Sequence, residues 1–136
     1  MFTDICYSND HHISPHTLSR IANFNRDRNW AQFHNPKDLA ISISLEAAEL
    51  LECFQWSGSD LTVEDKRQHL IEETADVIIY ALQMCQVLDV NPDEIINQKL
   101  DKNEEKYPVE AAYGNASKYT ALQNKGQPEE VQDDHL

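Results

Sequence analysis

The sequence predicts an all-α fold in which each subunit is a four-helix bundle. Capping residues precede four segments with helical hydrophobic spacing, and three of these segments have Pro in the first turn. No segment shows the alternating apolar and polar residues of a half-buried strand. Two of the helical segments are apolar around most of their circumference, which is typical of helices in the middle of a bundle.

The four helices are expected at residues 15–28, 36–55, 63–88 and 92–106. The capping sequences at their starts are Ser14-Pro15, Asn35-Pro36, Thr62-Val63 and Asn91-Pro92. Gly58 separates the second helix from the third, and residues 89–91 separate the third from the fourth. The fourth helix is expected to stop before Pro108, because the residue preceding a proline disfavours the helical conformation.

A single domain is expected over residues 14–110, preceded by an N-terminal segment at 1–13 and followed by a polar tail at 111–136. From Gly114 onward the tail lacks periodicity, so it is expected to be extended or mobile unless a partner subunit holds it. Helices this apolar in a chain of 136 residues also indicate that a partner subunit covers part of their surface.

The overall composition excludes several classes of partner. The formal net charge is −13 and the sequence has no dense basic cluster, which argues against binding to a nucleic-acid polymer. Cys6, Cys53 and Cys85 lack metal-ligand spacing and are expected to be reduced thiols. No apolar run reaches membrane-spanning length, and the first residues lack the pattern of a signal peptide. A cytoplasmic protein without membrane contact is therefore expected.

The most informative residues are two acidic pairs in otherwise apolar helices. Glu46 and Glu49 form the first pair, and Glu73 and Asp76 form the second. Residues three apart share one face of a helix, so each pair can offer two oxygen ligands to one ion. Burying four carboxylates without a cation would be very costly. The pattern predicts a metal site between helices, with a solvated acidic surface as the alternative.

The ligand chemistry indicates which metal and which substrate such a site would take. Oxygen ligands with no accompanying His or Cys favour Mg²⁺ or Mn²⁺ over zinc or copper. Mg²⁺ is commonly held by a few carboxylates together with substrate phosphates, so a phosphoanhydride is the expected substrate. The metal would neutralise phosphate charge and lower the pKa of an attacking water, and a carboxylate would accept the proton.

Longer motifs give a more specific indication. LEAAEL and EETADV resemble the paired E-x-x-E and E-x-x-D signature of the MazG-like all-α nucleoside triphosphate pyrophosphohydrolases. The stretches RDRNWAQFHNPKDLAISISLEAAELLECFQW, EETADVIIYAL and KLDKNEEKYPVE resemble the branch of that family that contains the dCTP pyrophosphatases, and the resemblance covers residues 16–110. It implies hydrolysis of a (deoxy)nucleoside triphosphate to a monophosphate and diphosphate, with a preference for dCTP or related deoxynucleotides, as house-cleaning of the nucleotide pool.

The same resemblance assigns roles to the acids. Glu46, Glu49, Glu73 and Asp76 would bind Mg²⁺, and Glu49, or otherwise Glu46, would act as the general base toward water. Leu45 stands where the larger family often has a further Glu, which leaves the number of ions open. Similar short members are tetramers, so a homotetramer or a dimer is expected, with active sites partly shared between subunits.

Lys99 and Asn103 are expected to contact the triphosphate. They lie four residues apart on the helix face that also carries Ile96 and Leu100, which would direct them inward. An inward Lys is costly as a packing residue unless it meets an acidic group. The K-x-x-x-N-x-x-x-Y-P ending also resembles that of the family, and this resemblance implies ligand contact by both side chains.

Four further residues are expected at the nucleobase. Trp30, Trp56 and Tyr80 resemble the aromatic residues that line the base pocket in the dCTP pyrophosphatase branch, and His34 would contact a base edge. Flat rings offer a stacking surface to any base. A position in the hydrophobic core is the alternative for each ring. The placement of Tyr80 on the same helical strip as Asp76 favours the site.

Two other classes of protein compete with this interpretation. One is a di-iron carboxylate bundle, but such bundles usually place His three residues after Glu, and neither acidic pair here does so. The other is a non-catalytic helical interaction module that binds a basic partner with its acidic surface. That module predicts four acids that are exposed and do not converge.

Overall fold

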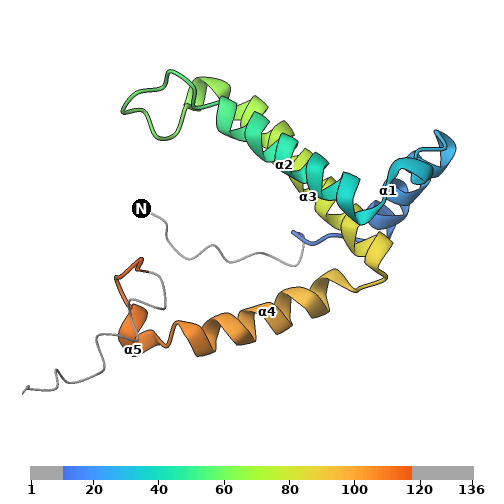
Figure 1. Cartoon of the computed structure of the whole chain (residues 1–136). Helices are drawn as coiled ribbons and strands as arrows, with labels where there is room; N and C mark the ends of the chain where they lie inside the picture. Colours follow the sequence, from blue (N-terminus) through green and yellow to red (C-terminus); the bar gives the residue numbers. More distant parts are fainter. Residues whose placement is uncertain (1–10, 118–136) are drawn as a thin grey trace, which may run out of the picture. The chain divides into compact units, whose positions relative to one another are not determined.

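A computed structural model describes residues 11–117, and every regular element in that range is helical (Figure 1). The all-α prediction is therefore confirmed for the described residues. The four main helices are α1 (Pro15–Asp27), α2 (Pro36–Glu52), α3 (Arg67–Leu88) and α4 (Pro92–Lys106). Three short elements are η1 (Ala31–Phe33), η2 (Glu64–Lys66) and α5 (Val109–Ala112).

The chain divides into two compact units, residues 1–90 and 91–136. The first unit contains α1, α2 and α3, and the second contains α4 and α5. Helix α5 crosses the expected boundary between the domain and the tail after residue 110, and it ends before Gly114, where the irregular part of the tail is expected. The tail beyond residue 117 lies outside the described residues. The four-helix bundle and the proposed domain limits stay predictions.

Three of the four expected helix starts are confirmed, each with its own cap. Ser14 Oγ accepts the Thr17 N–H at 3.1 Å at the start of α1. The Oδ1 atoms of Asn35 and Asn91 accept backbone N–H groups at 2.9 Å at the starts of α2 and α4. These bonds satisfy donors that the first helical turn leaves unpaired, and a Pro follows each cap. Local sequence therefore determines these three starts.

The third start differs from the expectation. Thr62 does not cap this start, and no side chain caps η2 or α3. Asp60 Oδ1 instead accepts the N–H groups of Thr62 and Val63, both at 3.1 Å, in the turn that precedes both elements. Val63 is buried and has φ of 42°, a left-handed conformation in which a right-handed helix cannot begin. The chain then forms η2, and α3 starts only at Arg67.

Helices α2 and α3 form an antiparallel hairpin that is the main packing unit of residues 1–90 (Figure 1). Leu39 and Cys53 of the first arm and Leu82 of the second are buried between the elements of this unit. At the hairpin loop, Lys66 Nζ donates to the backbone oxygen of Cys53 at 3.0 Å. The packing of α2 against α3, together with this hydrogen bond, holds the acid-bearing faces of the two helices in a fixed register.

Helix α1 packs against α3 near the end of the hairpin away from the loop (Figure 1). Ile21 is its buried apolar contact residue, and Gln86 Nε2 of α3 donates to the backbone oxygen of Leu18 at 3.3 Å. The packing of α1 places the residues that follow it beside the C-terminal half of α3.

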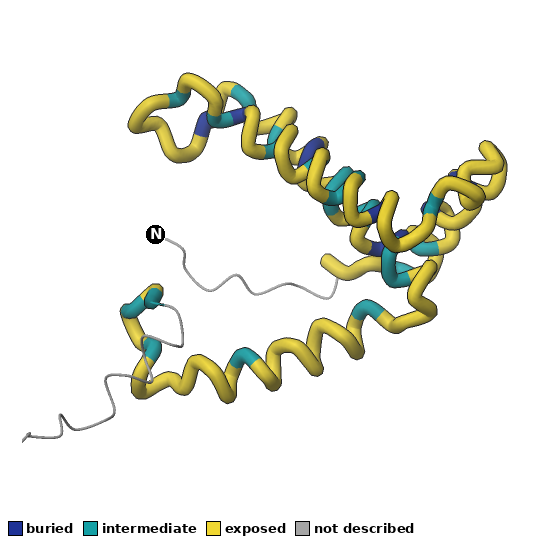
Figure 2. Tube along the Cα trace, in the orientation of Figure 1, coloured by how far each residue is buried: buried dark blue, intermediate teal, exposed yellow. Residues whose placement is uncertain are grey.

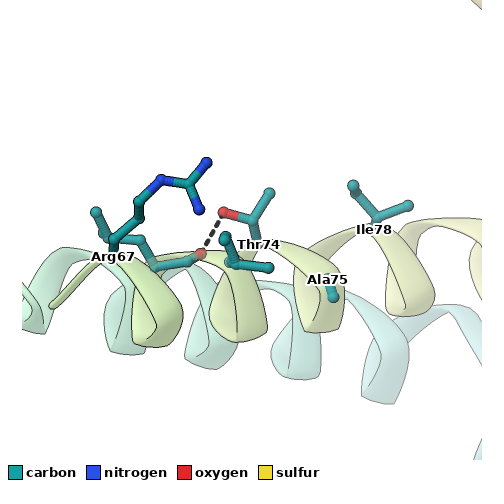
Figure 3. A pocket seen from close by; sticks show the side chains of 6 residues that line it. Arg67, Thr74, Ala75 and Ile78 are labelled. Carbon is teal, nitrogen blue, oxygen red and sulfur yellow. Dashed lines mark hydrogen bonds between the residues drawn. The ribbon is translucent and has the colours of Figure 1, made fainter. Parts of the chain in front are cut away.

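Much of the apolar surface is exposed in the single chain (Figure 2). One outward groove of about 410 Å³ runs along α3, where Ile71 and Ile78 are 44% and 46% exposed (Figure 3). Thr74, which lies between them, directs its hydroxyl back to the Leu70 backbone oxygen at 2.6 Å, so its methyl group adds to the apolar face. No helix among residues 11–117 is long and apolar enough to cross a membrane.

Candidate active site

Three carboxylates converge where α2 packs on α3. Glu46 and Glu49 project from α2 and Glu73 projects from α3, and one oxygen of each lies within 4.8 Å of the others. Oxygen ligands on one Mg²⁺ lie about 2.1 Å from the ion and so up to about 4 Å from each other. A small side-chain rotation would therefore close this set around a cation. The donor set is entirely oxygen, which is the type that Mg²⁺ and Mn²⁺ prefer.

The electrostatics of the cluster are those of acids held close together. Burial, followed by the charges of Glu49, Asp76 and Glu73, raises the pKa of Glu46. Burial, followed by the charge of Glu49, also raises the pKa of Glu73. Both shifts arise because the charged form loses solvation and meets like charges. A bound cation would reverse both effects.

Glu73 is the most sheltered acid of the cluster. It is buried, and His69 Nε2 lies 3.5 Å from its Oε1 atom. Its Oε2 atom has no hydrogen-bond partner among the described residues. A buried carboxylate oxygen that lacks a donor is unusual in folded proteins. The unpartnered oxygen therefore fits a ligand position for a metal ion.

Asp76 lies one turn beyond Glu73 on α3. Its charge contributes to the raised pKa of both Glu46 and Glu73, so it is close enough to act on the cluster. It does not belong to the group of three whose oxygens converge. Instead, Asp76 lines the hollow next to them, and thus connects the acids to that hollow.

The hollow has a volume of about 550 Å³, within the range of small-molecule pockets. Residues from α1, from the segment after it and from α3 line it. They are Thr17, Arg20, Ile21, Asn23, Phe24, Asn25, Asp27, Arg28, Trp30, His34, Asp76, Ile79, Tyr80 and Gln83. Three of the four residues expected at the base, Trp30, His34 and Tyr80, therefore share one pocket.

The aromatic rings of the pocket lie edge to face. The ring centroids of Phe24 and Trp30 are 5.7 Å apart with an interplanar angle of 75°. Those of His34 and Tyr80 are 6.5 Å apart at 76°. The Arg28 guanidinium carbon lies over the Phe24 ring, 3.6 Å from its centroid. Such a wall offers both ring faces and polar ring edges to a flat ligand.

The turn that ends α1 positions Trp30. Asn29 has φ of 55°, the Asn29 N–H donates to Arg26 O at 3.0 Å, and the Trp30 N–H donates to Asn25 O at 2.8 Å. This pair of bonds around a left-handed residue is a Schellman motif, which reverses the chain at a helix end. Asn tolerates the left-handed conformation well, so the local sequence brings Trp30 back against α1.

The remaining expected residues are Trp56, Lys99 and Asn103. Trp56 follows the end of α2, has φ of 68° and is 92% exposed, and it is not among the residues that line the hollow. Lys99 and Asn103 belong to α4 in the other unit, where Ile96 and Leu100 on the same face are about half exposed. Substrate contact by Trp56, Lys99 and Asn103 stays a prediction.

Among the pocket residues that sequence analysis did not assign to the site, Asn25 and Gln83 are notable for their burial. Both are buried, and both have a side-chain oxygen without a partner in the described part of the chain. A signal was present for each of them. Asn25 lies four residues after Ile21 on the face of α1 that packs inward, and Gln83 continues the strip of Asp76 and Tyr80 on α3.

The chain is similar to several known proteins. The model of the MazG-like family matches residues 41–122. The chain is 36% identical over 106 residues to dCTP pyrophosphatase 1 of Mus musculus, and this match covers 74% of the chain and 62% of the mouse protein. The human dCTP pyrophosphatase 1 is 34% identical over the same length, with 74% and 62% covered. The chain thus spans less than two thirds of the length of these relatives.

A solved structure is also similar. The crystal structure of a pyrophosphatase from Archaeoglobus fulgidus superposes with a TM-score of 0.63 at 45% identity, and the match covers 72% of this chain and 97% of that one. The helical fold is therefore shared with a solved pyrophosphatase. Together with the family match over residues 41–122, this places the chain in the MazG-like family.

Proposed function

We propose that the protein is a Mg²⁺-dependent nucleoside triphosphate pyrophosphohydrolase that converts a (deoxy)nucleoside triphosphate and water to the monophosphate and diphosphate. The observation that carries this proposal is the convergence of Glu46, Glu49 and Glu73 beside an aromatic pocket of ligand size. The names of the mouse and human relatives support dCTP or related deoxynucleotides as the preferred substrates.

In this proposal Glu46, Glu49, Glu73 and Asp76 hold the metal, either Mg²⁺ or Mn²⁺. The bound ion would neutralise the phosphates and lower the pKa of a water. Glu49 accepts the proton of the attacking water, with Glu46 as the alternative base. The burial of Glu73 and its unpartnered oxygen support a ligand role for that residue. The fixed register of α2 and α3 keeps the acids oriented before substrate arrives.

Trp30, His34 and Tyr80 would hold the base in the pocket, with its phosphates directed toward Asp76 and the acids. Stacking on aromatic rings contributes to nucleotide affinity without regard to the base. Lys99 and Asn103 would contact the triphosphate. Trp56 would contribute from a second copy of the chain, since sites shared between subunits are expected for a homotetramer or dimer. The exposed apolar groove along α3 supports such an assembly.

The rival interaction module is less well supported. It requires acids that are exposed and separated, whereas Glu73 is buried and lies close to two other carboxylates. The proposed enzyme would act in house-cleaning of the cytoplasmic nucleotide pool.

Product analysis tests the reaction. The purified chain is incubated with dCTP, dUTP, dTTP, dATP and dGTP in Mg²⁺, and the products are separated by anion exchange. The proposal predicts a deoxynucleoside monophosphate plus diphosphate, with dCTP consumed fastest.

Glu73→Gln should reduce turnover at least about a hundredfold, as expected for loss of a metal ligand. Glu52→Gln, an exposed α2 acid outside the cluster, is the matched control. If the first products were a deoxynucleoside diphosphate and orthophosphate, the proposed bond cleavage would be refuted.

A further inference from the structure

Two buried amide side chains lie in the wall of the pocket, one on α1 and one on α3. Asn25 of α1 is 7% exposed and Gln83 of α3 is 5% exposed. Asn25 Oδ1 and Gln83 Oε1 have no hydrogen-bond partner within residues 11–117. Buried polar atoms are nearly always paired, because losing water without gaining a partner costs free energy. Two unpaired acceptors in one small region therefore require an explanation.

The position of these amides points to a ligand. Both line the 550 Å³ pocket together with Trp30 and Tyr80. Both also line a smaller hollow of about 220 Å³, and His34 is the third residue that the two hollows share. Asn25 and Gln83 thus form part of the wall that the two hollows share.

A structural role for the amides has no support in their contacts. The backbone oxygen of Asn25 accepts the Trp30 N–H, but its side chain caps no helix. Gln83 lies inside α3, well away from either end of the helix. Apolar residues of similar size would fill both positions without leaving an acceptor unpaired.

We propose that Asn25 and Gln83 select the nucleobase by accepting hydrogen bonds from an exocyclic amino group. This inference rests on the proposed function. An amino group carries two N–H donors, which matches two unpaired acceptors. In the orientation that the two amides have in the structure, an oxo group at the same ring position would place oxygen against oxygen and leave both acceptors unpaired. The pocket should therefore prefer a cytosine base over a uracil base, which carries an oxo group at that position and a ring N–H beside it.

The test compares Gln83→Met and Asn25→Leu with wild type in the full chain. Both changes keep side-chain size and remove the acceptor. The binding of dCMP and dUMP is measured by calorimetry without metal, and kcat/KM is measured for dCTP and dUTP with Mg²⁺. Each variant should reduce the dCMP to dUMP affinity ratio, and the matching kcat/KM ratio, by about tenfold. Turnover of dUTP should change much less. Gln68→Met, an exposed position on α3, should leave both ratios unchanged.

Melting temperatures distinguish a role of Asn25 and Gln83 in base selection from a role in packing. If the unpaired acceptors serve a ligand, both variants should melt at or above the wild-type temperature in the absence of nucleotide, because an unpaired buried polar atom has been removed. Folded variants with unchanged ratios, or wild-type protein that binds dUMP as well as dCMP, would overturn the inference. A wild-type protein that discriminates the monophosphates but releases no diphosphate would refute the proposed function and leave the inference standing.

Discussion

Glu49 of α2 and Glu73 of α3 face each other across the helix hairpin, with a carboxylate oxygen of each within 4.8 Å of the other. Two negative charges at this distance repel each other, and the burial of Glu73 strengthens the repulsion. Folding nevertheless brings them together, because the apolar faces of α2 and α3 fix the register of the helices. A cation between the two residues would turn the repulsion into attraction.

Mg²⁺ should therefore stabilise the folded chain. At a concentration of about 100 times the Kd, a ligand that binds only the native state adds about 2.7 kcal/mol to the free energy of unfolding. Differential scanning calorimetry with and without Mg²⁺ measures the shift in melting temperature. Glu73→Gln should lose most of the shift, whereas Glu52→Gln should keep it. If Mg²⁺ shifted the melting temperature of both variants equally, the ion would bind outside the cluster of Glu46, Glu49 and Glu73.

The stability of the metal-free protein should depend on pH. Burial and neighbouring carboxylates raise the pKa of Glu46 and Glu73 above their ordinary value of 4.5. A carboxyl with a higher pKa in the folded state stabilises the fold fully below its unfolded-state pKa, and this contribution is lost as the pH rises through the folded-state pKa. The free energy of unfolding contributed by these groups should thus fall from pH 4.5 toward neutral pH.

Urea unfolding at a series of pH values measures this dependence. The double variant Glu46→Gln with Glu73→Gln removes both titrating groups, so its stability should fall less steeply than that of the wild type. It should also be the more stable protein at neutral pH without metal. A double variant with the wild-type slope would show that other groups cause the pH dependence.

Trp30→Ala should weaken nucleotide binding more than it slows the chemical step. Base stacking on an aromatic ring contributes about 1–3 kcal/mol, so KM for dCTP should rise about tenfold while kcat falls by less. Steady-state kinetics separate the two parameters. Phe33→Ala, a 60% exposed ring that does not line the pocket, is the control and should leave KM unchanged. A fall in kcat alone would argue against a base-binding role for Trp30.

The apolar groove of α3 should be an interface between copies of the chain. Ile78→Glu places a charge at one end of that groove, where Ile71 and Ile78 are both about half exposed. Light scattering on the eluted protein should then show a smaller assembly than the wild type. Gln68→Glu adds the same charge to the same helix outside the groove and should not change the mass. Unchanged mass for Ile78→Glu would exclude this face from the interface.

Local chemistry determines the parts of the fold that the sequence could predict. The side chains of Ser14, Asn35 and Asn91 cap helices within three residues of themselves, so short-range sequence is sufficient to place those starts. Val63 is different, because its left-handed conformation depends on the Asp60 side chain and on burial of the Val63 side chain against the hairpin. The Asp60 hydrogen bond is as local as a cap, whereas the burial of Val63 is a tertiary effect that is not visible in a capping pattern.

The candidate site, like the fold, could be predicted from the sequence only in part. Spacing placed Glu46 and Glu49 on one face, and family resemblance indicated Trp30, His34 and Tyr80, which share a pocket. The convergence of the α2 pair with Glu73 depends on the register between two helices. The unpaired amides could not be recognised in advance, since pairing is a property of the packed structure.

The most direct test is the position of the metal. Crystals of the full chain grown with Mn²⁺ and a non-hydrolysable dCTP analogue would give an anomalous difference peak at each ion. The proposal predicts a peak bound by oxygens of Glu46, Glu49, Glu73 and Asp76, with the base of the analogue against Trp30 and Tyr80. A nucleotide bound with its metal elsewhere, and these carboxylates without an ion, would contradict it.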